Sequence, residues 1–166
     1  MKGDNIMKKE IKAIPDGFHT VTASLSLKDS LKAITFYEKA FGAKNPEVFP
    51  SPDGKHTMHA TIQIGDSILM MGDEMPDMGC KSAESLGASP ISLYVYVPDV
   101  DAVFVQAVAA GATEVMPIAD MFWGDRCGTL TDPFGYQWTI ATHKRDLTEK
   151  EIQEGAEAFF AAMEKP

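Results

Sequence analysis

The sequence predicts an α+β fold in which two βαβββ modules form a curved mixed sheet around a cleft, followed by a C-terminal helix. Three observations lead to this prediction. A strand pattern followed by a helix pattern occurs twice, each copy continues into a hairpin, and an amphipathic segment follows the second copy. A repeat of this length indicates two similar units that cover one another or pair edge to edge.

Each copy begins with a strand and a helix. In 22–27 polar residues alternate with apolar ones, which is typical of a half-buried strand. From Ser30 the apolar residues follow a helical period, and Gly42 supplies a C-terminal stop. The segment 91–115 repeats this design, with a helix that starts near Asp99 or Asp101 and ends at Gly111. The polar and aromatic face of the two first strands is predicted to line the cleft; it consists of Thr22, Ser24, Ser26, Ser92, Tyr94 and Tyr96.

The second halves of the copies also match. Residues 56–71 are predicted to form two strands joined at Gly65-Asp66, and residues 125–141 two strands joined at 132–135. Each copy has room for one more strand between helix and hairpin, around 47–50 and 114–118.

The domain boundaries follow from this repeat. We expect an N-terminal arm (1–17), one domain over 18–145 and a C-terminal helix (146–166). The domain contains module one (18–74), a flexible linker (75–90) and module two (91–145). Thr148 and Glu151 have capping-box spacing at the start of the last helix, whose apolar stripe is expected to dock on the domain or on a partner subunit.

Composition excludes several functional classes. The chain has 166 residues, 45% of them hydrophobic, with a net charge of −9 and a pI near 4.8, which disfavours a nucleic-acid-binding surface. No run of about 18 apolar residues is present, so a membrane span is not expected. The N-terminus has no apolar core of a secretory signal, and two distant cysteines make no disulfide framework. We therefore expect a cytoplasmic protein.

Three segments resemble a known family. They are FYEKAFGAK (36–44), HATIQIGDSILMMGDE (59–74) and FWGDRCGTLTDPFGYQWTIATHK (122–144). Together they are similar to the vicinal oxygen chelate superfamily, which holds glyoxalase I, bleomycin-resistance proteins and extradiol dioxygenases. The last segment looks most like its PhnB-like branch. The resemblance covers about residues 18–145 and implies a homodimer whose clefts bind a small molecule.

The resemblance also implies where a divalent metal would be held. In metal-dependent members the ligands come from the first and last strands of each module, and these positions fall on Thr22, Leu69, Ser92 and Thr139. Neutral hydroxyls are poor ligands and Leu has no lone pair, whereas such metals prefer imidazole nitrogen and carboxylate oxygen. We therefore predict no metal or other cofactor, and the sequence leaves open whether the protein is an enzyme.

Several side chains are candidates for ligand binding in the cleft. His59 has the alternation of a cleft-facing residue, and the alternative is a surface histidine. Asp125 and Arg126 are adjacent on a strand and point to opposite faces; Arg126 either reaches the cleft, where it would hold an acidic group, or forms a salt bridge between the modules. Trp123 is expected at the rim of the cleft, and His143 is expected to cap the last strand or face solvent.

Two functions remain open at this point. The first is a metal-independent protein that buries an apolar or aromatic small molecule in its cleft. The candidate ligand-binding residues are His59, Arg126, Trp123, Tyr94, Tyr96, Thr22, Ser92 and Thr139. The second is a metal-dependent enzyme of the glyoxalase or dioxygenase type, with ligands recruited from His19, His59 or a partner subunit.

Overall fold

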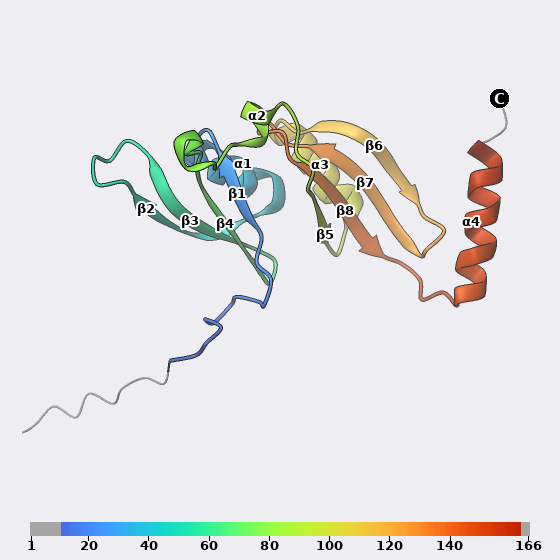
Figure 1. The fold of residues 1–166 in the computed structure, drawn as a ribbon. Coiled ribbons are helices and arrows are strands. Elements are labelled where there is room, and N and C mark those ends of the chain that lie inside the picture. The colour runs from blue at the N-terminus through green and yellow to red at the C-terminus, as the bar shows by residue number, and fades with distance from the viewer. Residues whose placement is uncertain (1–10, 164–166) are drawn as a thin grey trace, which may run out of the picture.

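The structure is a computed structural model that describes residues 11–163. The chain forms two modules of identical element order (Figure 1). Module one contains β1 (Ser24–Leu27), α1 (Ser30–Phe41), β2 (Lys44–Pro50), β3 (Thr57–Ile64) and β4 (Ser67–Asp73). Module two contains β5 (Ser92–Tyr96), α3 (Val100–Ala110), β6 (Thr113–Asp120), β7 (Asp125–Thr131) and β8 (Gln137–His143). The predicted pair of βαβββ modules is therefore confirmed.

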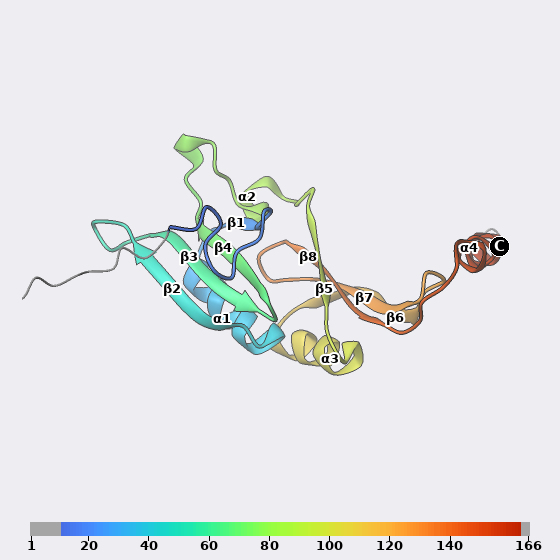
Figure 2. The same ribbon diagram turned by 90° about the horizontal axis from the view of Figure 1, so that it is seen from below.

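The eight strands form two separate four-stranded sheets, ordered β1-β4-β3-β2 and β5-β8-β7-β6. In each sheet the first and last strands pair in parallel and the other neighbours are antiparallel. The helices α1 and α3 lie on the same side of the two sheets and pack against each other (Figure 2). Gln106 of α3 strengthens this contact, because its side-chain amide donates to the carbonyl oxygens of Lys39 and Ala40.

Both helices begin and end by the same devices. Asp29 and Asp99 are the N-caps, and their carboxylates accept hydrogen bonds from the backbone N–H groups of Lys32 and Ala102. The helix α1 ends at Gly42, whose φ of 65° is the left-handed conformation that glycine adopts without steric cost. The predicted starts and stops of both helices are confirmed.

The core lies between the sheets and the helices and continues across the junction of the modules. Leu25, Leu27, Ile62 and Met71 pack under α1, and Leu130, Trp138 and Ile140 pack under α3. At the junction, the Tyr37 and Phe36 rings of α1 meet Phe134 and Trp138 of module two. The two modules therefore share one hydrophobic core.

A buried carboxylate connects the modules inside this core. Asp132, 4% exposed, accepts hydrogen bonds from Tyr37 Oη (2.8 Å), Trp138 Nε1 (2.9 Å) and two backbone N–H groups of its own turn. Burial raises the pKa of Asp132, and the surrounding donors oppose that rise. The 132–135 turn is thus both a hairpin connection and the polar contact between the modules.

The linker at 75–90, which the sequence predicted to be flexible, contains two short helices. Residues 75–90 hold the short 3₁₀ helix η1 (Pro76–Met78) and the short helix α2 (Ala83–Leu86), and Ala83 is buried in the core. Glu74 anchors this linker by accepting hydrogen bonds from Ser82 and Ser85. Residues 11–17 contain no helix or strand, and the rest of the predicted N-terminal arm lies outside the described residues.

The C-terminal helix α4 (Glu149–Met163) stands at the end of module two, beside the β6 and β7 connection (Figure 1). Thr148 and Glu151 form the predicted capping box. Phe122 packs against Phe159 and Phe160, yet no residue of α4 is fully buried. Across residues 11–163, no helix is long and apolar enough to cross a membrane.

Candidate functional site

The two faces of the module-two sheet have different neighbours. A Cβ added to Gly128 would meet the ring of Phe104, so Gly128 and the residues that alternate with it face α3. Asp125, Cys127 and Thr129 occupy the opposite side, which we call the open face. Tyr94 and Tyr96 lie on the open face as well, because both reach Asp125.

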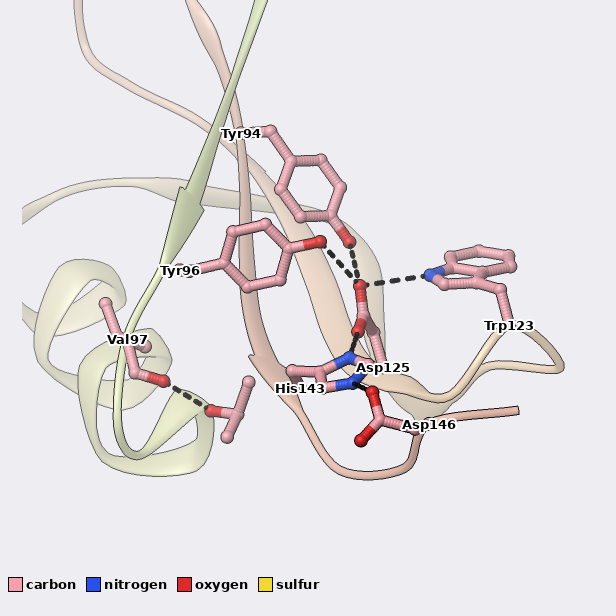
Figure 3. Close-up of polar contacts among 8 residues, drawn as sticks. Tyr94, Tyr96, Val97, Trp123, Asp125, His143 and Asp146 are labelled. Carbon is pink, nitrogen blue, oxygen red and sulfur yellow. Dashed lines mark hydrogen bonds and ion pairs between the residues drawn. The ribbon is translucent and has the colours of Figure 1, made fainter. Parts of the chain in front are cut away.

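A polar cluster centred on Asp125 occupies this open face (Figure 3). Asp125 Oδ2 accepts hydrogen bonds from Tyr94 Oη (3.2 Å), Tyr96 Oη (2.9 Å) and Trp123 Nε1 (3.2 Å). Its other oxygen, Oδ1, lies 2.7 Å from His143 Nδ1. The Asp125 side chain is buried, whereas Tyr94, Tyr96 and Trp123 are 48%, 63% and 36% exposed. The cluster thus consists of a shielded carboxylate with an aromatic rim.

The hydrogen bonds define the charge state of the cluster. Burial by itself would raise the pKa of Asp125, but the donors of His143, Tyr96, Tyr94 and Trp123 together hold it below the ordinary value of 3.8. The hydrogen bond to Asp125 raises the pKa of Tyr96; burial, the Cys127 thiol and Asp125 raise that of Tyr94. At neutral pH the site therefore contains an ionised carboxylate and two neutral phenols.

His143 extends the cluster toward the C-terminal segment. Its Nε2 lies 3.1 Å from Asp146 Oδ1, so the ring is placed between two carboxylates. The bonds to Asp125 and Asp146 raise the pKa of the imidazole above its ordinary 6.5. His143 was expected to cap the last strand or face solvent; its side chain is about half exposed, and it also orients Asp125.

A cleft of about 770 Å³ adjoins the cluster at the junction of the modules. One wall is the edge strand β5 and the loop after it, and the other is the β3–β4 turn with the segment before β1. Its lining includes Phe41, Ile64, Ile68, Leu69, Leu93, Tyr94, Val95, Tyr96, Val97 and Trp138, and its polar members include His19, Thr22, Asp66 and Ser67. Tyr94 and Tyr96 belong to both the cleft and the cluster.

The structure brings together only some of the predicted site residues. Tyr94, Tyr96 and Trp123 meet at Asp125, and Thr22 lines the cleft, where its hydroxyl donates to the His19 carbonyl. Thr139 is further along the open face and shares a 3.0 Å hydrogen bond with Thr129. Ser92 is exposed at the start of β5.

His59 belongs to the other module. It lies on β3 opposite Phe49, away from the cluster.

Arg126 does not reach the cleft. It lies on the helix side of β7, where its guanidinium binds Asp101 of α3 through Nε (2.9 Å) and Nη2 (2.7 Å) and approaches Asp120 of β6 (3.3 Å). This ion pair lies within module two rather than between the modules. Neither alternative expected for Arg126 is met, because the strand registers make Met58 its counterpart in module one, whereas the counterpart of His59 is Cys127 on the open face.

Leu69 was also placed one residue out of register. It is buried and pairs with Ile62, as Trp138 pairs with Leu130, so the true counterpart of Thr139 is Met70. The positions that would hold a metal are therefore Thr22, Met70, Ser92 and Thr139. Three hydroxyls and a thioether do not fit a divalent metal such as Zn²⁺ or Fe²⁺. Within residues 11–163, no three His, Cys, Asp or Glu side chains gather as metal ligands.

The sequence reasoning missed Asp125 and His143 as partners. The signal was present in the hairpin: pairing outward from Thr131 and Gln137 brings Asp125 opposite His143. Adjacent side chains on a strand point to opposite faces, and Arg126 lies on the helix side of β7, so Asp125 lies on the open face.

Comparison with known proteins agrees with this architecture. The sequence profile of the Glyoxalase/Bleomycin resistance protein/Dioxygenase superfamily matches residues 18–140. The chain belongs to this superfamily. Uncharacterized proteins of Mycobacterium bovis and Mycobacterium tuberculosis are 42% identical over 132 residues, which is 78% of this chain and 86% and 77% of theirs.

Solved structures of the superfamily fold are similar as well. TioX from Micromonospora sp. ML1 aligns with a TM-score of 0.58 at 26% identity, over 74% of this chain and 97% of its own. A gene product of Arabidopsis thaliana gives 0.58 at 27% identity, over 75% and 98%. A PhnB protein from Bacillus cereus gives 0.56 at 19% identity, over 75% and 99%, which reflects the shared fold alone.

Proposed function

We propose that this superfamily member binds a small organic molecule in the cleft between its modules without a resident metal. The observation that carries the proposal is the 770 Å³ cleft, whose lining is mostly apolar and shares Tyr94 and Tyr96 with the Asp125 cluster. Its volume lies in the range of about 300–1,000 Å³ that is typical of small-molecule sites. Apolar residues would bury the body of the ligand, and Tyr94 and Tyr96 would fix its orientation.

Membership in the PhnB-like branch is part of this proposal. It is supported by the segment DPFGYQWTIATH at 132–143, which supplies both the inter-module Asp132 and the His143 of the cluster.

A homodimer is also part of the proposal. Aromatic side chains remain exposed outside the Asp125 cluster, on β2, including Phe49 (56%), and on α4, including Phe160 (57%). A second copy that packs on these faces would cover them and enclose the cleft. Sedimentation equilibrium tests this assembly, and a monomer at about 100 μM, far above the dissociation constant of a stable dimer, would contradict it.

A cytoplasmic location completes the proposal. Cys80 and Cys127 are both free thiols, which is the usual state in a reducing compartment.

The neutral dye N-phenyl-1-naphthylamine tests the cleft. Its fluorescence rises in an apolar environment, and we expect saturable binding to the wild-type protein. Ser67→Trp places a large side chain at an exposed position on the cleft wall and should abolish this binding. Thr35→Trp, at an exposed position of α1 outside the cleft, is the matched control and should bind as the wild type does. Equal binding by the Ser67→Trp protein would contradict the proposal.

A further inference from the structure

Three aromatic side chains converge on a single carboxylate oxygen. Tyr94 and Tyr96 come from β5, and Trp123 comes from the loop between β6 and β7. Their polar edges all point inward to Asp125 Oδ2, so their rings surround the carboxylate from three sides (Figure 3). We call Tyr94, Tyr96 and Trp123 the aromatic rim.

The hydrogen-bond donors of this cluster are already used. Both phenol O–H groups, the indole N–H and His143 Nδ1 are engaged by Asp125. A bound anion would therefore find no free donor here and would meet the negative charge of Asp125. The groups left for a ligand are the ring faces and the lone pairs of the phenol oxygens, all of which attract positive charge.

The rim also distinguishes between kinds of cation. A hydrated inorganic cation needs several oxygen ligands, but the oxygens of the buried Asp125 are occupied by protein donors. An alkylated ammonium group needs no such ligands, because it interacts with aromatic faces through their quadrupole. The cluster at the polar edge of the rings contains two carboxylates, Asp125 and Asp146, and a single imidazole, His143, so it stays net negative even when His143 is protonated, and this charge adds to that attraction.

The lining of the adjoining cleft also favours a cationic ligand over an anionic one. Tyr94 and Tyr96 form part of its wall, and the described residues that line it include Asp66 but no lysine or arginine. An apolar body in the cleft would thus hold a cationic group against the rim without meeting a lysine or arginine of the cleft wall. Arg126, Lys144 and Arg145 line a separate hollow at Asp125, where Arg126 is paired with Asp101 and Asp120.

We propose that the ligand of this protein is an organic cation, an alkylated ammonium group on an apolar body, and that the aromatic rim with Asp125 is the subsite for the ammonium group. This inference rests on the small-molecule-binding function proposed above and specifies the chemistry of its ligand.

A pair of isosteric probes tests the charge requirement on the wild-type protein. Choline carries a trimethylammonium group, and 3,3-dimethylbutan-1-ol replaces its nitrogen with a neutral carbon. With binding followed through the indole NMR signal of Trp123, we expect choline to bind at least about fivefold more tightly. Equal affinities, or no choline binding, would overturn the inference. Binding of N-phenyl-1-naphthylamine is measured separately, so loss of the cation preference and failure of the cleft itself are distinguishable.

Variants of the rim test the location of the subsite. Tyr96 is 63% exposed, so its replacement should not disturb folding. Tyr96→Leu removes the ring face and should weaken choline binding about threefold or more, whereas Tyr96→Phe retains the ring and should keep most of the affinity. Unchanged choline binding by the Tyr96→Leu protein would refute the assignment of the subsite.

A charge variant completes the test. Asp125→Asn removes the negative charge that the three rings surround and should abolish the preference for choline over its neutral isostere. Asp77→Asn removes the same charge from the exposed η1 segment and should leave the preference intact. An equal effect of both variants would mean that net charge, rather than the rim, attracts the cation, and would overturn the proposal. Because Asp125 is buried, circular dichroism must show that the variant folds, and the Tyr96 variants decide the question if it does not.

Discussion

Asp125 illustrates how the fold maintains an ionised group out of water. Its side chain is 4% exposed, and both of its oxygens are satisfied by donors from β5, from the loop before β7 and from β8. A buried charge without such partners would cost several kcal/mol, which the four donors offset. The same bonds fix the orientation of the Tyr94, Tyr96 and Trp123 rings, so the carboxylate organises the proposed binding site.

The pH dependence of stability at His143 follows from its raised pKa. The pKa of His143 is higher in the folded state than in the unfolded state. Its protonation therefore stabilises the folded protein at low pH, and this contribution to the free energy of unfolding disappears as the pH rises through the folded-state pKa. We therefore expect the wild type to exceed His143→Gln in Tm most clearly below about pH 6.5, with the difference shrinking as the pH rises through the raised pKa of the folded state. Thermal denaturation of both proteins across this range checks the prediction. A difference that grows with pH would contradict it.

Sequence reasoning succeeded for residues whose role depends on periodicity and was less reliable where register decides. Leu25, Leu27 and Trp138 lie in the core, and the alternation along their strands alone determines this facing. Arg126 and Leu69 were misplaced because the hairpins differ: two residues connect β3 to β4, and five connect β7 to β8. The offset between the repeats therefore changes from strand to strand, and an error of one residue moves a side chain to the other face.

At the scale of elements, both modules attach the start of their helix to their last strand. In module one, Asp73 of β4 accepts hydrogen bonds from the backbone N–H groups of Ser30 (2.9 Å) and Thr57 (2.8 Å). In module two, Thr142 of β8 accepts from the N–H of Val100 (2.9 Å). The repeat thus preserves a tie between helix and sheet, although the residue type that forms it has changed.

This tie predicts the effect of a substitution at Asp73. Asp73→Ala leaves two backbone donors without an acceptor, and the residues that carry them, Ser30 and Thr57, are buried. We expect a loss of about 2–3 kcal/mol in the free energy of unfolding. Chemical denaturation measures this loss, with Asp77→Ala in the exposed η1 segment as the control that should change stability little. Equal stabilities of the two variants would show that water replaces Asp73 at no cost.

At the scale of the whole molecule, the modules are connected by α1 packing on α3 and by polar contacts across the core. Tyr37 Oη donates to the carboxylate of Asp132, and Tyr136 Oη donates to the neutral backbone carbonyl of Ser26 (2.8 Å). Both bonds join module one to module two. The acceptor is charged in the first bond and neutral in the second. Removing the two tyrosine hydroxyls one at a time therefore compares the contribution of a charged acceptor with that of a neutral one.

Tyr37→Phe should therefore cost more than Tyr136→Phe. Hydrogen bonds to charged acceptors contribute about 1.5–3 kcal/mol, compared with about 0.5–1.5 kcal/mol for neutral ones. Loss of the Tyr37 donor also leaves the buried Asp132 with one partner fewer. Denaturant unfolding of both variants checks the order, and a larger loss for Tyr136→Phe would reverse our view of which contact connects the modules.

The bond between Tyr37 and Asp132 also bears on how the chain folds. Its partners are separated by 95 positions in the sequence, whereas the contacts within each hairpin are local. Local contacts form early because they close short loops, and distant contacts wait until the segments that carry them are in place. Each module would then collapse around its own helix before the Asp132 carboxylate becomes buried between the modules. Docking of the two modules is therefore the late step. Loss of the Tyr37 hydroxyl would accordingly accelerate unfolding and leave the refolding rate almost unchanged.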